Sequence, residues 1–240
     1  QYNGSEESTF DAYRRFIIEN IVLQAINERL RSMAEDPDSV FIGSSVSHTR
    51  FNRNEESYAL SAGLREESIQ EGITILLEEL ERIRRYGILE SELQRAKLES
   101  MSSYEQYHQG RETLSSSLKA EELIRAYLND EPVPGTEMEY TLAKYYIPQI
   151  SREDTNAFLK NFMRSGSAVI QLIGPQKEGL TLPTEKGLAD LYTKALKASL
   201  APPTEESINE SPLLKEPTPG SIVKKEMIEA LRLHKWTLSN

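Results

Sequence analysis

Three histidines, His48, His108 and His234, are the side chains of this 240-residue sequence best suited to bind a metal or to move a proton. They lie far apart along the chain, so no two of them have the one-turn helical spacing or the hairpin spacing of a metal site. Glu105 and His108 form a single Glu-x-x-His, the half-motif of di-iron bundles, which need two copies and two further glutamates. We therefore predict no metal ligand, no cofactor-binding residue and no catalytic residue in this chain.

The sequence also contains no recognisable motif of a nucleophilic catalytic site or of a phosphate-binding loop. The hydroxyl-rich segment 42–47 (IGSSVS) has no general base near it in sequence, and we interpret it as strand packing. There is no Gly-x-Ser-x-Gly elbow, no Gly-x-x-x-x-Gly-Lys loop and no Gly-x-Gly-x-x-Gly turn. Adjacent carboxylates point to different sides of a helix and are interpreted as solvated faces rather than acid–base pairs. These pairs are Glu66/Glu67, Glu78/Glu79 and Glu121/Glu122.

The arginines and tyrosines also have structural explanations. Arg82, Arg84 and Arg85 lie at the end of a predicted helix, where positive charge complements the negative end of the helix dipole. The tyrosines at helical spacing, which are Tyr104, Tyr107, Tyr145 and Tyr146, are interpreted as core packing rather than as a binding stripe. From the residues alone, no reaction centre can be assembled.

The charge balance and the lack of cysteine exclude several classes of binding partner and of chemistry. The 38 acidic residues outnumber the 28 basic ones, and the formal charge of -10 repels phosphate backbones and anionic lipid headgroups. We therefore predict no nucleic-acid partner and no membrane partner. The chain has no cysteine, which excludes disulfides, thiolate metal sites and cysteine nucleophiles.

The elements that position these residues begin with a helix followed by two strands. Ser8 or Thr9 can cap the helix, and Asp36-Pro37-Asp38 ends it, because proline disfavours the helical conformation in the residue before it. From Ser39 the hydrophobic period changes to two, which predicts an antiparallel pair of strands. The helix face expected to be buried carries Phe10, Tyr13, Ile17, Ile21, Ile26 and Leu30. The strand side chains expected to point to one side are Val40, Ile42, Val46, His48, Tyr58, Leu60, Ala62 and Leu64.

A joint between two helices is the best-defined local feature. A helix opens at Glu66 and Glu67 and ends at Gly87, the residue type that accepts a left-handed C-terminal turn. Beyond that stop, Leu89 and Leu93 begin the apolar stripe of a second helix. Later elements predicted are helices at 136–147, 151–162 (with Ser151 and Asp154 as a capping pair) and 185–200, a strand covered on both faces at 167–175, a proline-rich acidic connector, and a strand in 233–240.

The joint resembles one found in the pitrilysin/insulinase-like zinc metallopeptidases (the inverzincins), whose mitochondrial relatives are the processing peptidases. The segment GITILLEELERIRRYGILESELQRAKLES (72–100) follows that family's pattern. The matching positions are Gly87, Glu92, Leu93, Ala96 and Lys97. Similar helices at 25–33 and 150–162 and the strand 168–175 come in the family's order.

The tail extends the resemblance to nearly the whole chain. Residues 210–226 and 234–240 are similar to the link between the two halves of the long single-chain members and to the start of their third domain. The resemblance implies an α+β fold, a two-layer α/β sandwich in which an antiparallel sheet has helices packed on one face, with an extended C-terminal connector. It implies a non-catalytic domain at 1–175, a helix and connector between the halves at 176–232, and the first strand of the next domain at 233–240.

The family's catalytic signature, His-x-x-Glu-His, binds zinc and activates a water molecule, and it is absent from this sequence. The resemblance therefore implies a second domain that packs against the catalytic domain of the same polypeptide and helps to wall a chamber for peptide substrates. Zinc is expected in the parent protein and not in this chain. The long-chain bacterial character favours the periplasm or cell envelope.

Two departures from the family pattern lead to further expectations. Leu89 stands where the family has a capping Thr or Ser, so the second helix is expected to begin at Ser91. The strand that usually precedes the first helix is missing, which predicts an open sheet edge and edge-to-edge pairing of the isolated chain. The alternatives are a free-standing acidic adaptor with a disordered tail, or an independent hydrolase, which would turn over peptides by itself.

Overall fold

The structure is a computed structural model, and it describes residues 9–52, 55–129, 133–162, 168–205 and 219–239. The chain divides into two compact units, Gln1–Glu205 and Glu206–Asn240, which we call the helical unit and the hairpin unit. Each unit is described by itself. Within the described residues, no helix combines the length and the apolar character needed to span a bilayer.

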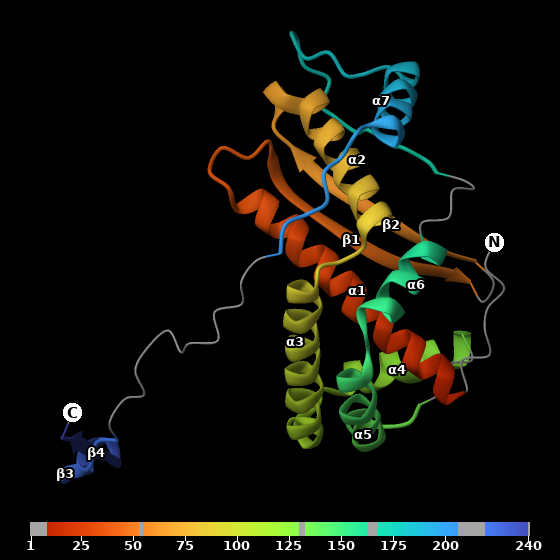
Figure 1. The fold of residues 1–240 in the computed structure, drawn as a ribbon. Coiled ribbons are helices and arrows are strands. Elements are labelled where there is room, and N and C mark those ends of the chain that lie inside the picture. The colour runs from red at the N-terminus through yellow and green to blue at the C-terminus, as the bar shows by residue number, and fades with distance from the viewer. Residues whose placement is uncertain (1–8, 53–54, 130–132, 163–167, 206–218, 240) are drawn as a thin grey trace. The chain divides into compact units, whose positions relative to one another are not determined.

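Helix α1 (Phe10–Glu35) forms the centre of the helical unit (Figure 1). Its start confirms the predicted cap, because the Thr9 hydroxyl accepts a hydrogen bond from the Ala12 amide at 3.1 Å. Its apolar stripe is buried as expected, except that Phe10, the first helical residue, is 66% exposed. The buried residues of α1 are Ala12, Ile17, Ile18, Ile21, Val22, Ala25, Ile26 and Leu30.

Strands β1 (Phe41–Asn52) and β2 (Glu55–Leu64) pair in antiparallel fashion, as predicted. Val46 lies opposite Leu60. The side chains of Leu60 and Leu64 point to the same face of the sheet, and Leu64 contacts α2. The prediction that Ile42 points the same way as Val46 is wrong, since Val46 is buried and the side chain of Ile42 is 74% exposed. A register shift between Phe41 and Gly43 changes the alternation there, so that Phe41 is buried instead.

The predicted helical joint is present. After a 3-10 turn η1 (Glu66–Ser68), α2 (Ile69–Tyr86) ends at Gly87, and α3 (Glu90–Gln109) follows. The expected start of α3 at Ser91 is wrong by one residue. The helix begins at Glu90, and the Glu92 carboxylate accepts a hydrogen bond from the Leu89 amide at 2.7 Å, which is the half of a capping box that does not require a hydroxyl at position 89.

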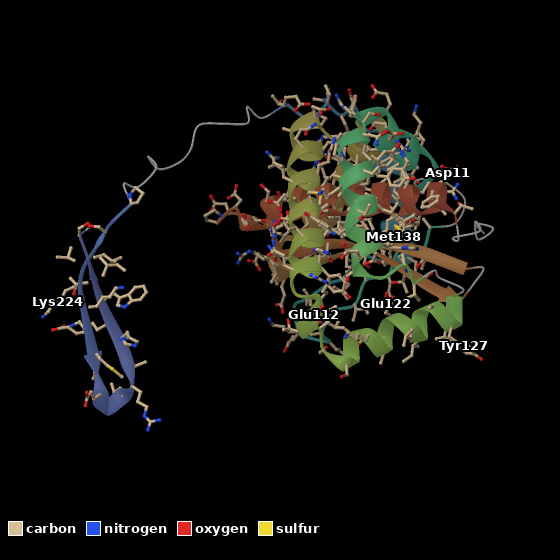
Figure 2. All side chains as sticks on the ribbon, turned by 90° about the horizontal axis from the view of Figure 1, so that it is seen from below. Asp11, Glu112, Glu122, Tyr127, Met138 and Lys224 are labelled. Carbon is tan, nitrogen blue, oxygen red and sulfur yellow. The ribbon has the colours of Figure 1, made fainter. Side chains whose placement is uncertain are left out.

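Helices α5, α6 and α7 match the predicted ranges closely, whereas α4 was not predicted. Ser151 and Asp154 form the predicted capping pair, with the Ser151 amide donating to the Asp154 carboxylate at 2.9 Å. Helix α4 has several exposed apolar side chains, and Figure 2 shows Tyr127 at its end pointing outward. The bounds are η2 Arg111–Thr113, α4 Ser116–Asn129, α5 Thr136–Tyr146, η3 Ile147–Gln149, α6 Arg152–Phe162 and α7 Glu185–Lys197.

The core of the helical unit joins α1 to β1, α3, α5 and α6. Strands and helices from separate parts of the chain thus share one hydrophobic cluster, and the fold is α+β with small antiparallel sheets, as predicted (Figure 1). The largest fully buried side chains of this cluster are Ile17, Ile21, Leu30, Ile83, Ile88, Leu93, Ile150 and Leu159.

The strand predicted at 167–175 is not formed in its described part, residues 168–175. Val169 and Ile173 are 92% and 82% exposed, so this apolar run is not a covered strand. An apolar run without periodicity does not specify a partner edge, and a strand requires one. In the described residues, β1 and β2 form a sheet by themselves.

The hairpin unit contains β3 (Ile222–Ile228) and β4 (Leu233–Leu238), joined by the turn η4 (Glu229–Leu231). The sequence predicted β4 but not β3, which lies in the stretch expected to be an extended connector. Three consecutive charged residues, 224–226, obscure the alternation of β3. The helical unit extends to Glu205 and includes α7, beyond the predicted boundary at 175. The assignment of these segments to family domains stays a prediction.

Candidate functional site: a charged joint between three helices

Arg29 of α1 reaches both helices of the joint. Its Nε donates to Glu92 at 2.6 Å, and its terminal nitrogens contact Glu79 at 3.1 Å and the Gly87 carbonyl oxygen at 3.5 Å. The side chains of Arg29 and of both glutamates are nearly buried, at 11% and 7% exposure. Glu79 was interpreted from sequence as part of a solvated face. That is wrong, because an arginine from α1 covers it.

The charge balance of this cluster follows from its burial. Burial alone lowers the pKa of the Arg29 guanidinium, but the hydrogen bond and charge of Glu92, together with the charge of Glu79, raise it above its ordinary value. A buried cation held by two carboxylates keeps its charge, and removing either partner exposes the other to a large desolvation penalty. The cluster therefore fixes α1, α2 and α3 against one another.

Gly87 makes the close approach at this joint possible. Its φ of 75° lies in the region that side chains other than glycine rarely adopt. A Cβ atom there would lie 1.8 Å from Oδ1 of Asn156 on α6. The sequence predicted the left-handed stop, whereas the crowding by α6 is visible only in the fold.

The arginines at the end of α2 do more than complement the helix dipole. Arg84 and Arg85 both bind Glu81, whose side chain is only 3% exposed, and the Arg84 hydrogen bond lowers the pKa of that carboxyl most strongly. Arg85 also donates to the carbonyl oxygens of Leu196 and Ala198, both at 2.8 Å. No local pattern predicts the contacts of Arg85 with Leu196 and Ala198, because these partners lie more than a hundred residues away.

The first turn of α3 is capped by a residue distant in sequence. One carboxylate oxygen of Glu205 accepts from the Glu90 amide at 2.9 Å and the other from the Ser91 amide at 3.3 Å. The bond from the Glu90 amide is the main reason that the pKa of Glu205 lies below its ordinary value. Sequence reasoning missed this cap, since nothing local relates Glu205 to α3.

Several known proteases are similar to this chain in sequence or in fold. No family model matches the chain. A zinc protease PQQL-like protein of Arabidopsis thaliana is 25% identical over 236 residues, which is 98% of this chain. The periplasmic protease PqqL from Escherichia coli superposes with a TM-score of 0.76 over 99% of this chain at 16% identity. A predicted insulinase-family protease from Yersinia pestis superposes with a TM-score of 0.65 over 81% of this chain at 12% identity.

Along almost its whole length the chain is similar to zinc proteases of the pitrilysin/insulinase-like kind. The structural likenesses show the fold, and the Arabidopsis protein adds sequence likeness along almost the whole chain. The chain spans only 22% of that relative and 26% of the E. coli protease, so it corresponds to part of a zinc-protease-like protein. A separate structure of the first half of PqqL covers 82% of this chain, with a TM-score of 0.69.

Two of the three histidines, His48 and His108, contact glutamates and stack on tyrosines. His48 Nδ1 lies 2.8 Å from Glu19, and the ring stacks on Tyr58. His108 lies 2.9 Å from Glu137, whose pKa it lowers, and its ring stacks on Tyr140. His234 is in β4 of the hairpin unit. Among the described residues, no group of three His, Asp or Glu side chains could hold a metal ion, and these residues therefore do not fit the zinc of the family.

The other sequence candidates also remain apart. Glu105 accepts a hydrogen bond from Gln109, while His108 faces α5, so the Glu-x-x-His pair does not converge. The Ser44 hydroxyl in segment 42–47 donates to the Leu30 carbonyl oxygen at 2.9 Å, which is a packing contact. Of the tyrosines, Tyr104 and Tyr146 pack against the core, and Tyr145 is 62% exposed.

Proposed function

We propose that this chain is the second, non-catalytic domain of a zinc endopeptidase. It packs against the catalytic domain of the same polypeptide, fixes that domain's orientation, and helps to wall the chamber that holds peptide substrates. The likeness along 98% of this chain to one fifth of a zinc-protease-like protein carries the proposal. The sequence has no His-x-x-Glu-His, and His48 and His108 contact Glu19 and Glu137.

The hairpin unit belongs, in this proposal, to the beginning of the parent's second half. The whole E. coli protease covers 99% of this chain, but its first half covers 82%. The share left uncovered is about as large as the hairpin unit, Glu206–Asn240. This difference supports a hairpin rather than a single strand as the start of the next domain.

The side chains of the hairpin fit the same assignment. Lys225 pairs with Trp236 and Met227 with His234, so Trp236 and Met227 share one face of the hairpin. Trp236 and Met227 are 57% and 58% exposed, and an isolated two-stranded hairpin is marginally stable in water. A neighbouring layer from the second half would bury this apolar face. Zinc would then be bound in the parent's catalytic domain, and the periplasmic location of the E. coli relative supports a location in the cell envelope.

Peptide cleavage by the separated parts tests the proposal. The purified 240-residue chain, supplied with equimolar zinc, should leave a quenched fluorescent peptide uncut. The parent's preceding segment with its zinc motif should cut the peptide only when this chain is added or covalently attached. Cleavage by this chain alone that a chelator abolishes would overturn the proposal, and so would full activity of the preceding segment without this chain.

A further inference from the structure

The segment that follows α7, residues 198–205, is held along the helical unit by α2. The Tyr86 hydroxyl donates to the Leu200 carbonyl oxygen at 2.7 Å, and Arg82 donates to the Ala201 carbonyl oxygen at 3.2 Å. Together with the contact of Arg85 to Ala198, these bonds come from the last turns of α2. We call residues 198–205 the strap.

The strap ends on the other helix of the joint. Glu205 uses its own side chain to cap α3, whereas the preceding strap residues are held through backbone carbonyl oxygens. The strap thus runs from the end of α2 to the beginning of α3, across the joint that Gly87 forms. A segment fastened at both ends across a joint opposes relative movement of the two helices.

We propose that the strap is a releasable latch for the α2–α3 joint, with Glu205 as its lock, and that the strap and the first turn of α3 open together. The carboxylate suits this role because the first amides of a helix have no partner within the helix and attract negative charge. This inference does not depend on the proposed function, since it concerns contacts within the helical unit.

Solvent exposure makes the lock releasable. Arg29 and its two glutamates are nearly buried, but the amide of Glu90, which Glu205 caps, is at the surface. The charged groups at this turn are Glu90 and Glu92 of α3, Arg29, which binds Glu92, and Arg152 of α6, whose charge acts on Glu205. The charge of Arg152 also lowers the pKa of Glu205, so the carboxylate stays ionised and the lock stays closed at neutral pH.

Amide exchange of the ¹⁵N-labelled 240-residue chain, followed by NMR, tests the latch. The amides of Glu90 and Ser91 report the lock directly, because Glu205 is the acceptor that holds both. Glu205→Gln leaves one acceptor oxygen where the carboxylate offers two, and exchange at one of these amides should become about tenfold faster. Glu178→Gln, which changes an exposed glutamate ahead of α7, is the matched control and should leave both rates unchanged.

Tyr86→Phe distinguishes a latch from a simple cap. It removes only the hydroxyl that holds Leu200 and touches neither Glu90 nor Ser91, yet it should speed their exchange roughly two- to fivefold if the strap opens as one unit. In the double variant the two effects should be less than additive. Unchanged rates in Glu205→Gln would overturn the lock. Unchanged rates in Tyr86→Phe, with faster exchange in Glu205→Gln, would overturn the latch and leave only the cap.

Discussion

Arg29 and Glu92, which are 63 positions apart in sequence, form a two-point ion pair that joins α1 to the first turn of α3. The same glutamate accepts the Leu89 amide, so a single carboxylate both caps α3 and anchors it to α1. One side chain therefore contributes both to the position and to the start of this helix, and Glu205 accepts the next two amides.

Removing the cation should destabilise the helical unit strongly. Arg29→Met leaves Glu79 and Glu92 nearly buried without their shared partner, and we expect a loss of about 3–5 kcal/mol in the free energy of unfolding. Urea denaturation followed by circular dichroism measures it. Arg31→Met is the control, because its ion pair with Glu28 is exposed and should contribute less than about 1 kcal/mol. Equal losses in the two variants would contradict this assignment.

Gly87→Ala should be costlier than the same change at another glycine of similar conformation. Gly87 and Gly135 have φ values of 75° and 78°, so both substitutions incur backbone strain of about 1–3 kcal/mol. Only Gly87→Ala also drives a Cβ into Asn156, which should add a further 1–3 kcal/mol or so, whereas the space at Gly135 is open. Thermal and urea unfolding measure the loss of stability in each of the two variants. Adding Asn156→Ala to Gly87→Ala should recover part of the difference, and no recovery would rule out the clash.

Acid should weaken the start of α6. Burial alone would raise the pKa of Asp154, but hydrogen bonds from Ser151 and Arg14, with the charge of Arg14, hold it below its ordinary value of 3.8. Because the folded pKa is depressed, this stabilisation is complete above the unfolded pKa and disappears as the pH falls through the folded one. Asp154→Asn should flatten the loss of stability below about pH 4. Asp190→Asn, on the exposed surface of α7, should leave the acid dependence of unfolding as in the unmodified protein.

Strand β2 gives the open edge through which isolated chains should associate. The side-chain amide of Asn27 pairs with both backbone groups of Val46, so these groups point away from β2. Leu60 lies directly opposite Val46, so its backbone N–H and C=O point away from β1, toward the open edge of β2. The backbone groups of Ala62, two residues further along β2, point the same way. We expect sedimentation to show concentration-dependent self-association that Ala62→Pro reduces. A clean monomer at millimolar concentration would count against edge pairing.

Local rules sufficed for several elements whose determining contacts are close in sequence, although they missed α4 and β3. Thr9, Gly87 and the Ser151–Asp154 pair bound their helices as predicted, because capping bonds and left-handed stops involve neighbours within a few positions. Alternation predicted the β1–β2 hairpin for the same reason. It failed at Ile42, where a register shift changes the facing of the chain, and at 168–175, where no partner edge is specified.

The sequence by itself determined every described α-helix of the helical unit except α4, the hairpin at 41–64, the absence of a His-x-x-Glu-His motif and the resemblance to the zinc peptidase family. Only the tertiary structure decided that Arg29 is shared by Glu79 and Glu92, that Asn156 crowds Gly87, and that Glu205 caps α3. These contacts join residues from 50 to 115 positions apart. Periodicity and capping act over a few residues, whereas such pairings depend on how whole elements pack, and packing is set by the complete core rather than by any one segment.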